Sequence, residues 1–266
     1  MKARGTRLEP ILDSVRARLD ARRRALHLAE LRRSATPDPA RRARFVGALK
    51  TSELEVIAEI KRRSPAKGDL ALAADPLDQA RRYARGGAAA LSVLTEEDHF
   101  RGSPDDLQRV APAGLPRLRK DFLLDESMVI EGLLWGADAV LLLACVLEGA
   151  LLGELCAAAR ELGVASLVEV HDDEELARAL AVEPDLVGVN ARDLTTFTID
   201  LATVERLIPQ VPARVVRVAE SGIATLADLR RVRAAGADAA LVGEALMRAG
   251  DPEATLRGWK EALRVG

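Results

Sequence analysis

Short apolar runs recur along the chain from residue 56 onwards, and a polar loop and an amphipathic stretch with helical spacing follow each run. The runs are rich in Leu, Val and Ala at nearly every position, which is typical of parallel strands buried on both faces. Eight runs have this form: residues 56–61, 90–96, 115–121, 139–144, 166–170, 186–191, 215–220 and 239–244. Strands alternating with helices predict an α/β fold, and eight repeats favour a single (β/α)8 TIM barrel.

Signals for helix ends agree with these repeats. Pro76 and Pro252 each follow an Asp, the pattern of a capped first turn, and Gly86, Gly163 and Gly236 follow helical stretches as stops. An open doubly wound sheet is the rival fold, but no Gly-x-Gly-x-x-Gly follows an early run, so a dinucleotide site lacks its phosphate turn.

A single barrel accounts for 266 residues. We therefore expect one structural domain, made of an N-terminal helical extension over residues 1–50 and a barrel over residues 51–266. Too few residues follow the eighth run for a second, fused barrel.

The first 50 residues are basic, with fourteen Lys or Arg against five Asp or Glu, although the whole chain carries a net charge of -2. A basic arm that binds nucleic acid is one interpretation. The other is a helix docked on protein, because apolar residues recur there at helical spacing. These residues are Leu8, Ile11, Leu12, Val15, Leu19 and Leu26. We expect the docked helix, with its arginines on the solvent face.

Composition excludes several classes of protein. Acidic residues at Glu9, Asp13 and Asp20 argue against a transit peptide, and no run approaches the ~20 apolar residues that cross a bilayer. Aromatic residues make up 3%, too few for a base-stacking platform. The chain is expected in the cytoplasm, as a monomer that meets neither nucleic acid nor membrane.

The cysteines and histidines do not form a metal-binding motif by spacing. Cys145 and Cys156 lie outside any Cys-x-x-Cys, and His27, His99 and His171 are scattered. Buried thiols are expected, without a metal site or a disulfide framework.

The candidate site follows from the alternation of side chains along strands. Ligands of such barrels bind where the strands end at their carboxyl termini, and residues two apart share a face. Helices cover the outside, so the charged face of each run must point into the barrel. The inward set near the strand ends is Glu59, Lys61, Lys120, Phe122, Glu169, His171, Asn190, Arg192 and Glu220. So many buried charges are costly unless they pair or a ligand compensates them.

Two further groups extend the predicted pocket. Ser221 and Gly222 follow one run, and Gly243 and Glu244 end the next, where backbone N–H groups of such barrels hold phosphate. Lys61 and Ser64 adjoin them once the barrel closes. Apolar candidates for the other end are Pro65, Phe100, Phe122, Leu141, Leu143 and Leu194. An anionic end, a charged middle and an apolar end suit a sugar phosphate joined to an aromatic ring.

Motifs in a fixed order make the chain resemble the indole-3-glycerol-phosphate synthase family of tryptophan biosynthesis. They are VIAEIKRRSPAKGDL, LSVLTEEDHFRGS, LRKDFLLDESMV, GADAVLLL, LVEVH, VGVNARDLTTF, VAESGI and LVGEALM, within residues 56–247. The resemblance implies a barrel with helices over its mouth. It also implies conversion of 1-(2-carboxyphenylamino)-1-deoxyribulose 5-phosphate to indole-3-glycerol phosphate, carbon dioxide and water, with no metal or organic cofactor.

The resemblance also implies roles for the residues. Lys120 would be the general acid, Glu59 and Glu169 would orient groups or accept protons, and Lys61 would link the carboxylate, phosphate or leaving hydroxyl. Asn190 and Arg192 would hold substrate, and Ser221, Gly222 and Gly243 the phosphate. We expect carboxylates and an apolar wall to tune the pKa of Lys120 towards neutrality.

Some features depart from the family pattern or stay open. Ala191, Met128 and Glu244 replace the residues common in the family; Ala191 should point outward, and Glu244 should turn its side chain away from phosphate.

RRSPAKG is expected to be a mobile loop whose Ser64, Pro65 and Lys67 close over substrate, with Arg62 and Arg63 in solvent. The alternatives are a lyase in which Lys120 forms a Schiff base and a phosphate-binding barrel without catalysis.

Overall fold

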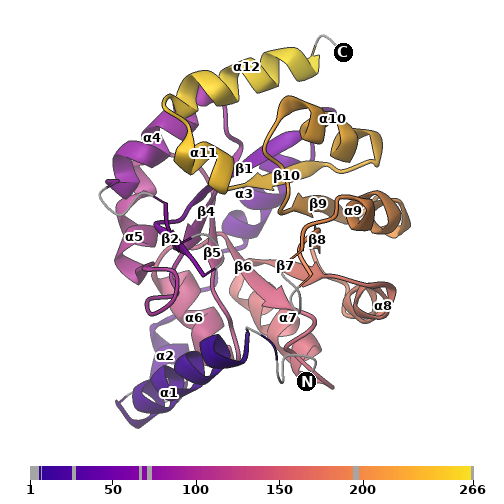
Figure 1. Cartoon of the computed structure of the whole chain (residues 1–266). Helices are drawn as coiled ribbons and strands as arrows, with labels where there is room; N and C mark the ends of the chain where they lie inside the picture. Colours follow the sequence, from indigo (N-terminus) through magenta and orange to yellow (C-terminus); the bar gives the residue numbers. More distant parts are fainter. Residues whose placement is uncertain are drawn as a thin grey trace.

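The eight apolar runs form eight parallel strands that close on themselves in the computed structural model, which describes residues 6, 8–25, 28–65, 68–70, 74–193 and 198–264. The strands are β1 (Glu55–Ile60), β4 (Ala90–Leu94), β5 (Arg117–Lys120), β6 (Ala139–Leu143), β7 (Ala165–Val170), β8 (Leu186–Asn190), β9 (Val216–Glu220) and β10 (Ala239–Val242). Strand β1 pairs with β4 on one side and with β10 on the other, which closes the barrel (Figure 1). The predicted TIM barrel is confirmed.

Helices alternate with the strands and surround them (Figure 1). They are α4 (Pro76–Gly86), α5 (Pro104–Arg109), α6 (Glu126–Leu134), α7 (Leu151–Leu162), α8 (Asp173–Ala181), α9 (Ala202–Leu207), α10 (Leu226–Ala234), α11 (Glu244–Arg248) and α12 (Pro252–Arg264), with 3₁₀ turns η1 (Ala111–Ala113) and η2 (Ile208–Gln210). The N-terminal segment adds α1 (Glu9–Ala25), α2 (Leu28–Ser34) and α3 (Pro39–Leu49). Among the described residues, no helix has the length and apolar character that crossing a membrane requires.

The predicted helix starts are confirmed by capping contacts. The Asp75 carboxylate accepts N–H bonds at the start of α4, and the Asp251 carboxylate accepts the N–H of Ala254 in α12. Gly163 ends α7 in the left-handed conformation, as expected. The stop after α4 is Gly87, one residue later than predicted.

Gly86, predicted as that stop, has a different reason to be glycine. It is the last residue of α4, where a Cβ would lie 2.9 Å from the Leu256 Cβ of α12. The absence of a side chain lets these two helices pack closely.

Side chains of the strands separate into two hydrophobic clusters. The outer cluster joins strands to helices and contains Val56, Ala58, Val140 and Val168. The inner cluster fills the barrel and includes Ile57 and Leu118, and on four strands it includes residues two positions apart: Ala139, Leu141 and Leu143; Ala165 and Leu167; Val216 and Val218; Ala239 and Leu241. The predicted inward and outward faces are therefore confirmed.

Helix α3 closes the bottom of the barrel, the end at which the strands begin. Phe45 and Leu49 are fully buried in the inner cluster, with Ala139, Ala165 and Ala239 at the starts of three strands. The N-terminal segment therefore covers both ends of the barrel, whereas the sequence led us to expect it over the mouth alone.

Three aspartates fix α3 to the bottom rim, one before each of β6, β8 and β10. Side chains of α3 and its C-cap bind them: Arg44 binds Asp138 at 2.7 Å, Arg42 binds Asp185 at 2.5 Å and Lys50 binds Asp238 at 3.3 Å. Each aspartate also accepts a backbone N–H from the neighbouring strand, at Arg117, Ser166 and Arg217 respectively. The same carboxylate thus orders a strand start and holds the helix.

Helix α1 lies at the mouth, the end at which the strands finish. The predicted apolar stripe is buried there: Leu8, Ile11, Leu12, Val15 and Leu19. Leu26 and His27 lie outside the described residues. The docked-helix interpretation of the basic segment is therefore confirmed.

Candidate active site

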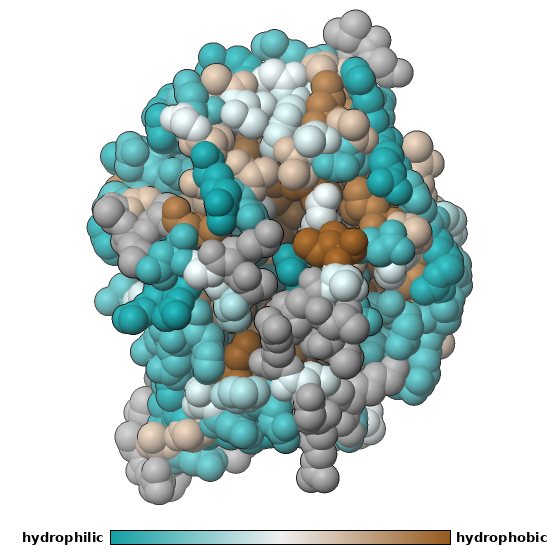
Figure 2. All heavy atoms as spheres, viewed as in Figure 1, coloured by the Kyte–Doolittle hydropathy of each residue, from teal (hydrophilic) through white to brown (hydrophobic). Residues whose placement is uncertain are grey.

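A cavity of about 680 Å³ opens at the mouth of the barrel. Figure 2 shows the surface hollowed near its centre, with hydrophobic side chains at the edge of the hollow. Its lining includes the predicted residues Glu59, Lys61, Ser64, Pro65, Phe100, Lys120, Phe122, Leu141, Leu143, Glu169, Asn190, Arg192, Glu220, Ser221, Gly222, Gly243 and Glu244. Leu194 lies outside the described residues. One cavity thus collects side chains from all parts of the barrel sequence.

Lys120 lies at the centre of the charged middle of this cavity. Its Nζ is 2.7 Å from Glu220 Oε2 and 3.1 Å from Glu169 Oε2, so β5 is joined to β9 and β7 across the barrel. The Asn190 amide donates to Glu169 Oε1 at 2.8 Å. A second pair forms on β1 and the residue after it, with Lys61 Nζ at 2.5 Å from Glu59 Oε1.

These contacts shift the carboxyl groups in different directions. Burial would raise the pKa of Glu169, but Lys120, His171 and Asn190 outweigh it and lower the pKa well below its usual range. Burial also opposes ionisation of Glu59, whose pKa is nevertheless lowered by Lys61 and Lys120. For Glu220 burial prevails and raises the pKa to about 7. Glu220 is thus the carboxyl group of this set that exchanges its proton near neutral pH.

The expectation for Lys120 was wrong in sign. Burial disfavours the charged amine, but Glu220, Glu169 and Glu59 surround it and raise its pKa above the usual lysine value. The apolar wall and the carboxylates act against each other, and the carboxylates win. Lys120 therefore carries its proton at neutral pH in this structure.

Two glycines make room for the carboxylates. A Cβ at Gly188 on β8 would lie 2.0 Å from Glu220 Oε1, and a Cβ at Gly243 would lie 2.4 Å from Glu59 Oε1. Real Cβ atoms essentially never approach so closely, below 3.0 Å. Gly188 lies two residues before Asn190 on β8 and so shares its inward face, but no prediction from the sequence assigned it this role.

The residues predicted to bind phosphate lie together on the β9 and β10 side. Ser221 and Gly222 both have left-handed backbone, with φ of 64° and 74°. Gly243 caps α11, and the Glu244 side chain binds Arg248 at 3.3 Å, a partner on its own helix. Arg248 also lines the cavity and was missed by the sequence argument.

Aromatic and aliphatic side chains form the other end. The Phe100 and Phe122 rings are tilted, with centroids 6.2 Å apart, near Leu141 and Leu143. Leu8 and Ile11 of the N-terminal segment complete this wall and were expected only as docking residues. Ala191 is buried in the outer cluster, as its predicted outward direction requires.

Two short strands begin within the segment RRSPAKG: β2 (Arg63–Ser64) pairs antiparallel with β3 (Gly68–Asp69). Arg62 was expected in solvent, but its guanidinium makes two hydrogen bonds with the buried Asp106 carboxylate. This ion pair joins the segment to α5. Lys67 lies outside the described residues, so its predicted contact with substrate remains a prediction.

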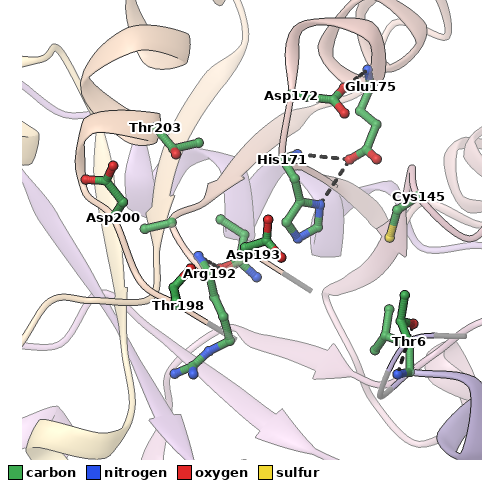
Figure 3. A pocket seen from close by; sticks show the side chains of 13 residues that line it. Thr6, Cys145, His171, Asp172, Glu175, Arg192, Asp193, Thr198, Asp200 and Thr203 are labelled. Atoms are coloured by element: carbon green, nitrogen blue, oxygen red, sulfur yellow. Dashed lines mark hydrogen bonds and ion pairs between the residues drawn. The ribbon is translucent and has the colours of Figure 1, made fainter. Parts of the chain in front are cut away.

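A second cavity, of about 360 Å³, lies beside the first and shares Leu8, Asn190 and Arg192 with it (Figure 3). His171 lines it, and its Nδ1 is 3.0 Å from Glu175 Oε2. Burial disfavours the imidazolium, but hydrogen bonds with Cys145, Glu169 and Glu175 raise the pKa of His171 to about 12. The predicted burial of both cysteines is confirmed.

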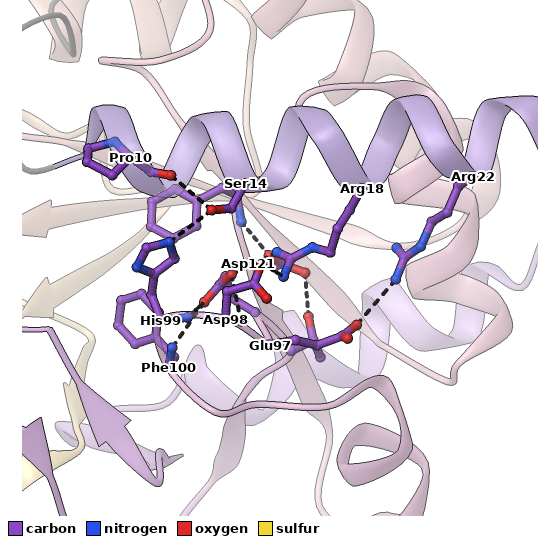
Figure 4. Close-up of polar contacts among 12 residues, drawn as sticks. Pro10, Ser14, Arg18, Arg22, Glu97, Asp98, His99, Phe100 and Asp121 are labelled. Carbon is purple, nitrogen blue, oxygen red and sulfur yellow. Dashed lines mark hydrogen bonds and ion pairs between the residues drawn. The ribbon is translucent and has the colours of Figure 1, made fainter.

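Helix α1 also holds the loop that carries Phe100 (Figure 4). The fully buried Glu96 accepts the backbone N–H groups of His99 and Phe100 and binds Arg18 of α1 at 2.7 Å. Arg22 of the same helix binds Glu131 at 3.2 Å. These two arginines were expected in solvent, but they connect the helix to the barrel.

Comparisons with known proteins agree with this geometry. A family model described as indole-3-glycerol phosphate synthase matches residues 8–258. Proteins of that name from Nocardioides sp. and Mycolicibacterium vanbaalenii are 49% and 44% identical, over 94% of this chain and 96% and 92% of theirs.

Solved structures of lower identity share the fold alone. Thiamine phosphate pyrophosphorylase from Pyrococcus furiosus has a TM-score of 0.61 at 18% identity, covering 80% of this chain and 96% of that one. A 3-hexulose-6-phosphate synthase has a TM-score of 0.60 at 19% identity, covering 79% of this chain and 99% of that one. The family match and the curated relatives together show that the chain belongs to the indole-3-glycerol phosphate synthase family.

Proposed function

We propose that the chain converts 1-(2-carboxyphenylamino)-1-deoxyribulose 5-phosphate into indole-3-glycerol phosphate, with release of carbon dioxide and water, and so acts as a carboxy-lyase. The observation that carries the proposal is the position of Lys120, held by two carboxylates between an apolar wall and an anion-binding end. An aromatic ring, a ketone and a phosphate in one molecule match these three regions in order.

Ring closure is the step that needs the charged middle of the cavity. The ring carbon that bears the carboxylate attacks the ketone carbon, and Lys120 donates a proton to the ketone oxygen as its negative charge develops. A fixed ammonium group in a buried site stabilises that oxygen strongly, since little solvent has to reorganise around it. The raised pKa of Lys120 keeps the ammonium charged before the reaction begins.

The later steps restore the aromatic ring. Carbon dioxide leaves with cleavage of its bond to the ring, the electron pair returns to the new five-membered ring, and loss of the protonated hydroxyl as water follows. Glu169, oriented by Asn190, and Glu59, paired with Lys61, are the proposed proton acceptors. We assign Lys61 to the leaving hydroxyl or the phosphate, because β1 adjoins β10.

Backbone groups are proposed to hold the phosphate. Ser221, Gly222 and Gly243 lie on adjacent strand ends, and Arg192 and Arg248 supply positive charge at the cavity. Glu244 contributes its backbone N–H alone, because its carboxylate is directed to Arg248. The proposal includes no cofactor and no nucleic acid, and describes a cytoplasmic monomer.

The assay is formation of the fluorescent indole product by purified protein. Lys120→Ala should lower kcat by a factor of about 10² to 10⁴, with a smaller change in KM, since general acid catalysis and charge stabilisation are lost together. Lys260→Ala is the matched control, because Lys260 binds Glu55 at the far end of β1. Wild-type protein that forms no indole would contradict the proposal, and a borohydride-trapped adduct on Lys120 would favour the Schiff-base lyase.

A further inference from the structure

Three side chains with metal-binding chemistry meet at the wall of the second cavity (Figure 3). Cys145 follows β6, His171 follows β7, and Glu175 lies in the first turn of α8. Their sulfur, nitrogen and oxygen donor atoms all lie within 4.8 Å of one another. The fold thus joins a thiol, an imidazole and a carboxylate that the sequence spacing keeps apart.

The group is enclosed and already ordered. Cys145 and Glu175 are buried, and backbone and ring groups of His171 both contact Glu175 Oε2, at 2.9 and 3.0 Å. The other ring nitrogen, Nε2, is buried and lies 3.4 Å from Glu169 Oε1. The His171 ring thus contacts both of the other donor groups, the Glu175 carboxylate through Nδ1 and the Cys145 thiol.

The donor set selects one class of ion. Mg²⁺ and Ca²⁺ prefer oxygen ligands, whereas Zn²⁺ binds thiolate, imidazole and carboxylate in a tetrahedron. Donors in such a tetrahedron lie roughly 3 to 4 Å apart at bond lengths of about 2.0 to 2.3 Å, so the present group needs only small side-chain shifts. The adjoining cavity supplies an entry path and room for a water molecule as a fourth ligand.

We propose that Cys145, His171 and Glu175 form a binding site for Zn²⁺. The ion replaces the proton between His171 and Glu175 and bonds the Cys145 thiolate, so that the ring and thiol protons pass to the buffer. The thiolate and the carboxylate balance the charge of the ion inside the protein, which keeps the cost of burial low. Since His171 also faces Glu169, occupancy of this site should alter the active site, but the binding itself does not depend on the proposed reaction.

The test uses the full chain without substrate, so it stands apart from the activity assay. Titration with Co²⁺ should give one equivalent of bound metal with a thiolate-to-cobalt charge-transfer band, and Zn²⁺ should displace it. Cys145→Ser should abolish the band and weaken Zn²⁺ binding, measured against a coloured chelator, by about 100-fold or more. Cys156→Ser is the matched control, because Cys156 is equally buried but lies on α7 outside the group.

Other outcomes would overturn the proposal. Wild-type protein without the charge-transfer band, or equal Zn²⁺ affinity in wild type and Cys145→Ser, would show that the thiol is not a ligand. Cys145→Ala provides a second variant without a polar group, and thermal melts report whether each variant folds. X-ray absorption at the zinc edge of the wild-type complex tests the proposal without any variant. The proposal requires one sulfur atom bonded to the zinc ion, and a spectrum without sulfur would contradict it.

Discussion

Gly188→Ala should displace the Glu220 carboxylate at the charged centre of the cavity while leaving the barrel folded. The new Cβ would lie 2.0 Å from Glu220 Oε1, so that oxygen must retreat by about 1.4 Å to reach an ordinary contact of 3.4 Å. Glu220 then loses its 2.7 Å contact with Lys120. A misplacement of about 1 Å in a catalytic group costs roughly 100-fold in kcat, equivalent to about 2.7 kcal/mol of barrier.

The same change should have little effect on folding. The displaced atom is the far end of a side chain, and Oε1 has no hydrogen bond to any described residue that would be lost. We expect a loss of about 1 kcal/mol or less in the free energy of unfolding, because the strain of overpacking is partly offset by replacing a glycine within a strand. The measurements are kcat and KM for indole formation and urea unfolding of the same samples.

Gly258→Ala is the control for this experiment. Gly258 lies in α12 with open space around a new Cβ, so this variant should keep wild-type kcat and gain slightly in stability. Wild-type kcat in Gly188→Ala would refute the argument that Glu220 holds Lys120 in its active position. Loss of the folded state would refute the argument that the strand tolerates the methyl group.

Three further predictions concern pH, the loop and the bottom of the barrel. The pKa of Glu220 rises from 4.5 in the unfolded chain to about 7 in the native protein, so between these pH values the native protein keeps a proton that the unfolded chain releases. The free energy of unfolding therefore falls as pH rises from 5 to 7.5, by on the order of 2 kcal/mol. Glu220→Gln should remove this fall, measured by urea unfolding at pH 5 and pH 7.5. Parallel pH profiles of the two proteins would contradict this. Glu96→Gln should loosen Phe100 and raise KM about tenfold with less effect on kcat, whereas an unchanged KM would show that Glu96 does not position the ring. Gly163→Ala should destabilise by about 3 kcal/mol in urea, because its φ is 75° and the Cβ would meet the Asp38 backbone at 2.4 Å; a loss below about 1 kcal/mol would contradict the contact.

The sequence predicted the inner face of the site well because strand alternation is a local rule. Once a strand carries helices outside and residues two apart share a face, Glu59, Lys120, Glu169 and Glu220 must point inward at the mouth. The rule needs no knowledge of which strands are neighbours. It therefore succeeded before the closure of the barrel was known.

The misses depend on contacts that no local rule contains. The ion pair of Arg62 with Asp106 joins residues on different repeats, and the position of α3 depends on the gap that the closed barrel leaves at its bottom. The sign of the Lys120 pKa depended on three distances, to carboxylates from three other strands, against the cost of burial. The balance between burial and ion pairing that sets a pKa follows from the assembled structure and not from residue types.

Helix α3 also limits the order in which the chain can fold during synthesis. Lys50 and its partner Asp238 are separated by 188 residues, so the ribosome completes most of the barrel sequence before the last strand can receive the helix. Until then Phe45 and Leu49 lack part of the surface that buries them. Although α3 precedes every barrel strand in the chain, it is therefore among the last elements to reach its final contacts, which leaves an apolar segment exposed to chaperones or to other nascent chains while the barrel is translated.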